Sequence, residues 1–151
     1  MIERLRHLVT SKPAPEFNDP VLGLLVSKYR GVWCGEIAFE GRQVGLIIPG
    51  DRQLPDKVCL EHARTLIPRL SEFVEQALRF AAQRQKESEW QAENNWTPKP
   101  GDNELEFVGV NYSSCDAAGD FALDFVQPAD ESGNCWEVHF RGSRPVEFEY
   151  T

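Results

Sequence analysis

No stretch of the chain is long and apolar enough to cross a bilayer, for which about 18 consecutive apolar residues are needed. The longest apolar runs, residues 21–26 and 44–48, have only the length of a β-strand. Residues 1–10 mix charged with apolar side chains, and they lack the hydrophobic core and the small-residue cleavage site of a secretion signal. We therefore expect a cytoplasmic protein that does not bind a membrane.

Catalytic and cofactor motifs are also missing. The chain contains neither the G-x-S-x-G nor the S-x-x-K pattern of serine nucleophiles, and neither of the glycine-rich loops that hold nucleotide phosphates. Cys59 and His62 stand three residues apart, but a working thiol and imidazole normally come from separate elements. We therefore predict no catalytic residue and no cofactor, and a binding protein is favoured over an enzyme.

The four cysteines and three histidines show no spacing typical of a disulfide framework or a metal site. No C-x-x-C pair occurs, and a chain of 151 residues buries enough core to fold without disulfides. The histidines are distant in sequence and form neither the H-x₃₋₅-H nor the H-E-x-x-H pattern of zinc proteins. The sequence predicts reduced thiols and no bound metal.

Positive charge is scarce in the last third of the chain. Residues 98–151 hold 3 Lys and Arg against 11 Asp and Glu, whereas residues 1–97 hold 13 of each kind, so the whole net charge of −8 lies in the last third. Nucleic acid is excluded as a partner of this segment, because phosphates are neutralised by Lys and Arg. The charge favours a basic protein partner.

Hydrophobic periodicity predicts a single α+β domain over residues 1–151, with a mainly antiparallel β-sheet and one long helix packed on its apolar face. A short N-terminal helix and a linker occupy residues 1–17. A β-meander follows at 18–50, the long helix at 56–90 and further strands at 104–150. Asp56 is the expected N-cap of the long helix, and Pro68 is expected to kink it.

The clearest alternation lies in the C-terminal strands, where large apolar residues alternate with polar ones. Their polar positions predict a surface that binds a partner, formed by Asp120, Asp124, Glu137, His139, Glu147 and Glu149. The competing interpretation is a solvated face that keeps the protein soluble and prevents edge pairing. In either case these side chains are expected to be exposed to solvent.

The segment 19–23 (Asp-Pro-Val-Leu-Gly), residues 33–35 (Trp-Cys-Gly) and the hairpin into 44–48 resemble a group of bacterial domains of unknown function. These domains open with Asp-Pro-x-Leu-Gly, continue through a Trp-x-Gly strand, a long helix and several C-terminal strands, and are often found among toxin-immunity genes. Their last strands often carry an aromatic residue and a histidine, as Trp136 and His139 do here. The resemblance implies no catalytic residues.

Taken together, the acidic last third and this resemblance predict an intracellular binding or inhibitory protein, plausibly an immunity protein that occludes the basic surface of a toxin. The alternative is a small hydrolase or transferase, which would have a deep pocket with carboxylates or histidines of strongly perturbed pKa. A third possibility is a structural subunit, which would expose a large apolar patch.

Overall fold

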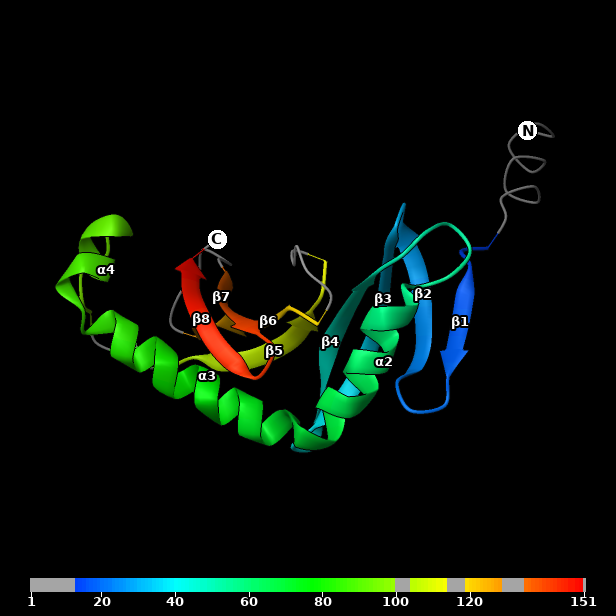
Figure 1. The fold of residues 1–151 in the computed structure, drawn as a ribbon, viewed down its shortest axis with the longest axis horizontal. Helices are drawn as coiled ribbons and strands as arrows, with labels where there is room; N and C mark the ends of the chain where they lie inside the picture. The colour runs from blue at the N-terminus through cyan, green and yellow to red at the C-terminus, as the bar shows by residue number, and fades with distance from the viewer. Residues whose placement is uncertain (1–12, 100–103, 114–118, 129–134, 151) are drawn as a thin grey trace, which may run out of the picture.

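The computed structural model describes residues 13–99, 104–113, 119–128 and 135–150. In this part of the chain, eight strands form one sheet in the order in which they follow along the sequence. Neighbouring strands are antiparallel except for the central pair, β4 and β5, which is parallel (Figure 1). The α+β class and the mainly antiparallel sheet are therefore confirmed. The N-terminal helix expected within residues 1–17 falls largely outside the described residues.

The first half of the sheet is a meander of β1 (Glu16–Asp19), β2 (Gly23–Tyr29), β3 (Val32–Phe39) and β4 (Arg42–Pro49). β3 and β4 are joined by Glu40 and Gly41, which both have a positive φ, of 47° and 81°. A two-residue hairpin turn whose two central residues have positive φ matches the twist of the flanking strands. The meander expected at 18–50 is thus present.

A helical segment connects the two halves of the sheet. It consists of α2 (Lys57–Leu66), a 3₁₀ turn η1 (Ile67–Arg69), α3 (Leu70–Gln85) and the short α4 (Ser88–Glu93). Asp56 caps α2, because its Oδ1 accepts the N–H of Cys59 at 2.9 Å. As expected, the helix is disturbed at Pro68, where the 3₁₀ turn lies. The expected end at residue 90 is wrong, since Glu87 has extended backbone angles and separates α3 from α4.

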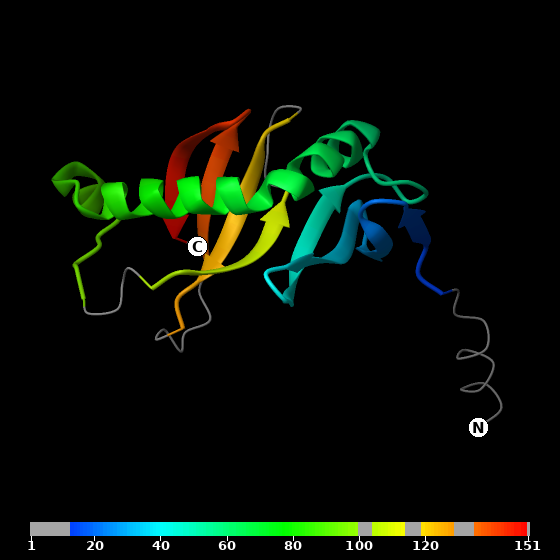
Figure 2. The same ribbon diagram turned by 90° about the horizontal axis from the view of Figure 1, so that it is seen from below.

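The second half of the sheet contains β5 (Glu106–Asn111), β6 (Phe121–Val126), β7 (Cys135–Arg141) and β8 (Arg144–Tyr150). α3 runs across this half on one side (Figure 2). Phe73 of α3 contacts Phe121 and Phe140, with ring centroids 5.7 and 5.4 Å apart. The side chains that alternate with these aromatic residues therefore point away from α3.

Within the described residues, no helix has the length and apolar character needed to span a membrane.

Candidate functional site

Polar side chains of three adjacent strands gather on the side of the sheet that faces away from α3. Asp124 of β6 lies opposite Glu137 of β7, and Glu137 lies opposite Glu149 of β8. In the next row, His139 pairs with Glu147. We call this set the acidic face: it consists of Asp124, Glu137, His139, Glu147 and Glu149.

The centre of the acidic face is a compact group of one imidazole and two carboxylates. The Nε2 atom of His139 lies 3.2 Å from Oε2 of Glu137 and 3.2 Å from Oε2 of Glu149. One ligand atom from each of the three residues can be chosen so that all lie within 4.8 Å of one another. The side chains of Glu137 and His139 are only 16% and 18% exposed. The expectation that these side chains are exposed to solvent is therefore wrong for Glu137 and His139.

Asp124 lies half-buried at the inner end of the first row. Burial and the neighbouring charge of Glu137 raise its pKa from 3.8 to about 7, against the opposing effects of a hydrogen bond from Asn111 and the charge of His139. Its Oδ1 atom is inaccessible to solvent and has no hydrogen-bond donor within the described part of the chain. At neutral pH this carboxyl is therefore divided between its acid and its ionised form.

Glu147 carries a second perturbed carboxyl of the acidic face. A hydrogen bond shared with Glu149, together with desolvation and the charge of Glu149, raises the pKa of Glu147, while the charge of His139 lowers it. Carboxylates of this face thus repel one another. Negative potential is concentrated where the strands β6, β7 and β8 lie side by side.

Asp120 is the one predicted binding residue that the structure does not bring to this group. Its charge acts instead on His62 of α2, opposing the burial that lowers the pKa of that imidazole. Nδ1 of His62 lies 2.7 Å from the hydroxyl of Tyr112, and the two rings pack edge to face. His62 therefore anchors α2 to the end of β5, and this gives it a structural role.

The Asp-Pro-x-Leu-Gly motif also has a structural explanation. Oδ1 of Asp19 accepts the backbone N–H groups of Val21 and Leu22 at 2.9 Å, and Oδ2 accepts Nε of Arg64 at 2.8 Å. Burial raises the pKa of Asp19, but these hydrogen bonds outweigh it and hold the pKa below its usual value. The motif closes the β1–β2 turn and ties it to α2.

The Trp-x-Gly motif is likewise part of the core. Trp33 is fully buried, and its Nε1–H donates to the backbone carbonyl of Asp51 at 3.0 Å. A Cβ atom on Gly35 would lie 2.5 Å from the side chain of Leu25, so any larger residue here would force Leu25 to move. Trp136 is buried as well.

An open cavity of about 420 Å³ lies at the edge of the acidic face, between β8 and the helices α3 and α4. Glu147 and Glu149 line it from β8, Arg84 from α3, and Trp90 from α4.

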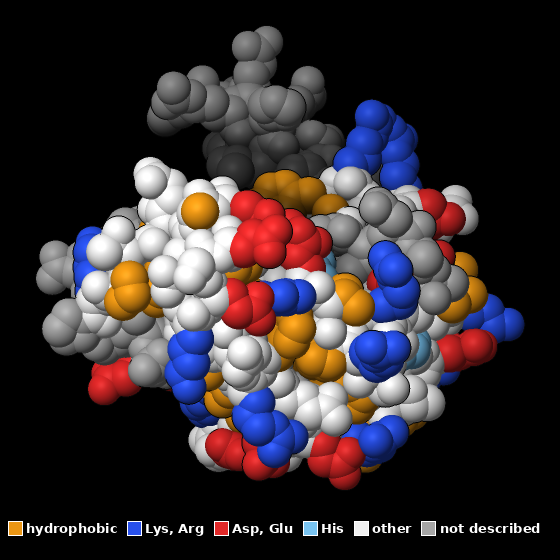
Figure 3. Space-filling view, turned by 60° about the vertical axis from the view of Figure 1, so that its left-hand side comes forward, with side chains coloured by type: hydrophobic (Ala, Val, Ile, Leu, Met, Phe, Trp, Pro, Cys, Tyr) orange, Lys and Arg blue, Asp and Glu red, His pale blue; other side chains and the backbone are white. Residues whose placement is uncertain are grey.

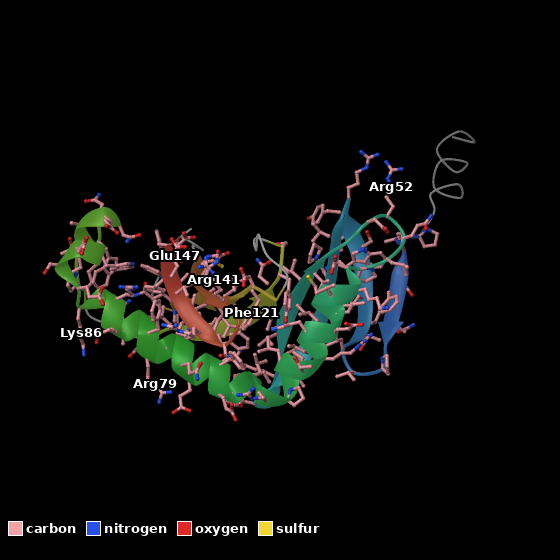
Figure 4. The ribbon with its side chains drawn as sticks, in the orientation of Figure 1. Arg52, Arg79, Lys86, Phe121, Arg141 and Glu147 are labelled. Carbon is pink, nitrogen blue, oxygen red and sulfur yellow. The ribbon has the colours of Figure 1, made fainter. Side chains whose placement is uncertain are left out.

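Figure 3 looks at the molecule from the α4 end and shows acidic side chains gathered above scattered Lys and Arg. In Figure 4, Glu147 and Arg141 lie over the C-terminal strands, and Arg79 and Lys86 lie along α3.

The alternation predicted four of the five carboxylates on one strand face correctly, but it did not predict two of their neighbours. Asn111 of β5 hydrogen-bonds Asp124, and Cys135 of β7 lies on the same face, where burial and the charges of Asp124 and Glu137 raise its pKa. The grouping of Glu137, His139 and Glu149 as possible ligands of one ion was missed too. Its signal was present in the alternating Glu-x-His of the strand.

No disulfide joins Cys34, Cys59 and Cys135, the cysteines that lie within the described residues.

Comparison of the chain with protein-family models, with curated proteins and with solved structures finds no match. The resemblance to bacterial domains found among toxin-immunity genes is thus still a prediction.

Proposed function

We propose that the chain is a cytoplasmic binding or inhibitory protein, of the immunity-protein kind, that receives a basic protein partner on its acidic face. One observation carries the proposal. Five of the six residues predicted from sequence to bind a partner come together on adjacent strands, on the side away from α3.

The electrostatics of the face support a cationic partner. Burial and the charge of Glu137 raise the pKa of Asp124, and a hydrogen bond shared with Glu149, burial and the charge of Glu149 raise the pKa of Glu147, so each carboxyl is in an environment unfavourable to negative charge. A Lys or Arg side chain of a partner, placed beside them, would relieve this repulsion. Complementary charge of this kind increases association rates and discriminates against acidic proteins.

The arrangement of layers supports the same proposal. Phe73 of α3 contacts Phe121 and Phe140 on the apolar side of the C-terminal strands, and the acidic face lies on the other side. Glu149 is 41% exposed and Glu147 is exposed, so the outer part of the acidic face is accessible. Glu137 and Asp124 are less exposed and would attract a basic partner through their electrostatic field rather than by direct contact.

The test is charge reversal at the accessible positions, with Glu147→Lys combined with Glu149→Lys. The basic protein that co-purifies with the chain from its native host is the partner used. We expect the variant to associate at least tenfold more slowly at low ionic strength and to lose the acceleration that low salt gives to the unmodified protein. Positions 124 and 137 are left unchanged, because their burial would confuse binding with folding.

The matched control is Glu72→Lys combined with Glu75→Lys, on the outward side of α3, where both side chains are more than 60% exposed. It changes the net charge equally and should slow association only slightly. If both double variants slow association to the same extent, net charge alone steers the partner and the acidic face is not its docking surface.

A second candidate function, a small hydrolase or transferase, is favoured by one observation. Asp124 titrates near neutral pH beside a second carboxylate, Glu137, and such pairs divide the roles of acid and base in many active sites. Asp124→Asn would abolish such an activity while leaving association with a basic partner nearly unchanged. Hydrolysis of model ester, phosphate or glycoside substrates by the unmodified protein and its loss in this variant would support the enzyme.

A further inference from the structure

We propose that Glu137, His139 and Glu149 form a binding site for one divalent transition-metal cation, of which Zn²⁺ is the type. This inference departs from the absence of a metal expected from sequence. It does not rest on the proposed function, because it concerns the isolated protein.

The spacing of the three ligand atoms fits a metal ion. In a tetrahedral zinc site, nitrogen and oxygen ligands lie about 2.1 Å from the ion, so two ligands are about 3.4 Å from each other. The Nε2 atom of His139 is 3.2 Å from each of the two carboxylate oxygens. Two of the three separations therefore match a tetrahedral site, and one ligand atom from each of the three residues lies within 4.8 Å of the others.

A simple ion pair explains this geometry less well. A charge-assisted N–H···O hydrogen bond is usually about 2.7–2.9 Å long, and a single N–H points at one acceptor. Here Nε2 is equidistant from two carboxylates, at 3.2 Å from each. A cation bound by Nε2 of His139 and by the two carboxylate oxygens accounts for both 3.2 Å distances.

Among the described residues, further carboxylates also surround the three proposed ligands. Glu137 faces Asp124 across the strands, and Asp124 has a buried Oδ1 atom without a hydrogen-bond donor in the described part of the protein. Glu147 pairs with His139 in the neighbouring row and adds a further carboxylate. One imidazole cannot neutralise this set, whereas a divalent cation would bring a charge of +2 into its centre.

The backbone holds the ligands in place. Glu137 and His139 are separated by one residue on β7 and so project on the same side, and Glu149 lies directly opposite Glu137 on β8. Sites built on paired strands hold their geometry better than sites on loops. Mixed imidazole and carboxylate ligation suits Zn²⁺ better than Mg²⁺ or Ca²⁺, which prefer oxygen alone. Three protein ligands leave a fourth position open to water.

The experiment is calorimetric titration of the full chain with Zn²⁺ at pH 7.5, after removal of metals with a chelator and in the presence of a reductant. We expect one equivalent to bind and to raise the melting temperature. His139→Gln and Glu149→Gln should each weaken binding at least tenfold. Melting of each variant without metal verifies that it folds. Glu149→Gln is expected to disturb folding less than His139→Gln, because the Glu149 side chain is 41% exposed.

Two matched controls separate this site from other zinc ligands. Glu36→Gln removes an exposed carboxylate on β3, and Cys135→Ser removes the thiol two residues before Glu137, so both should retain binding. Co²⁺ should show visible absorption bands of a tetrahedral site without a thiolate charge-transfer band. The proposal is refuted if Zn²⁺ does not bind at about 1 mM, if Cys135→Ser abolishes binding, or if His139→Gln and Glu149→Gln bind as tightly as Glu36→Gln. Equal binding of Mg²⁺ would also contradict it.

Discussion

The half-buried carboxyl of Asp124 should destabilise the protein at neutral and alkaline pH, so Asp124→Asn should stabilise it there. Its pKa is about 7 in the folded protein, against an ordinary value of 3.8. A carboxyl whose pKa is higher in the folded than in the unfolded chain lowers stability as the pH rises from the unfolded to the folded pKa. Above the folded pKa its contribution is constant. Each pH unit between the two pKa values lowers the free energy of unfolding by about 1.4 kcal/mol, so the whole loss is roughly 4 kcal/mol.

This figure is an upper limit, since part of the carboxyl remains accessible to water, and we expect a gain of about 2–4 kcal/mol for Asp124→Asn at pH 8. Asparagine keeps the shape of the side chain and can still accept the hydrogen bond from Asn111. The gain should shrink steadily below pH 7 and disappear near pH 4. Denaturant unfolding of both proteins at several pH values, with a chelator present, measures the difference.

The control for this prediction is Glu36→Gln, which removes one exposed carboxylate on the same side of the sheet. Its effect should stay within about 0.5 kcal/mol at every pH, as is usual for surface positions. If Asp124→Asn shows no pH-dependent gain relative to this control, then burial and the charge of Glu137 do not act on Asp124 as the structure indicates.

Three further substitutions test the core, each by the midpoint of urea unfolding. Leu70→Ala should cost about 2–5 kcal/mol, because this side chain at the start of α3 is only 2% exposed; a loss below about 1 kcal/mol would contradict its burial. Asp19→Ala should cost about 2–4 kcal/mol, because two backbone N–H groups and Arg64 lose their acceptor, and an unchanged midpoint would refute the structural reading of the motif. Gly50→Ala should cost at least about 1 kcal/mol, since its Cβ would lie 2.7 Å from Cα of Pro55; a neutral effect would mean that the loop moves freely.

The elements of the fold were predictable where the signal is local. Alternation with a period of two placed Phe121, Trp136 and Phe148 on one side of their strands, and all three are buried. The cap at Asp56 and the disturbance at Pro68 follow from local backbone chemistry. The end of the long helix was not predictable in this way, since the residues near Glu87 are good helix formers and the break depends on where Trp90 packs.

The features that depend on pairing between distant segments were not predictable from the sequence. The two halves of the sheet join through a parallel pair in which Gly45 lies opposite Gly109, and no local pattern marks this contact. The alignment of Glu149 with Glu137 depends on register, which an irregularity between His139 and Phe140 shifts. The burial of Asp124 depends on the strands at both of its sides.

Asp19 and Asp124 differ in whether their carboxylates stabilise the folded protein. Asp19 is buried with two backbone donors and a guanidinium, so its charge is compensated and its pKa is lowered. Asp124 is half-buried beside another carboxylate, and its pKa is raised. The first arrangement stabilises the folded chain, whereas the second destabilises it at neutral pH. A group that stability alone does not explain is a candidate for function, and here it adjoins the residues proposed to bind a cation and a basic partner.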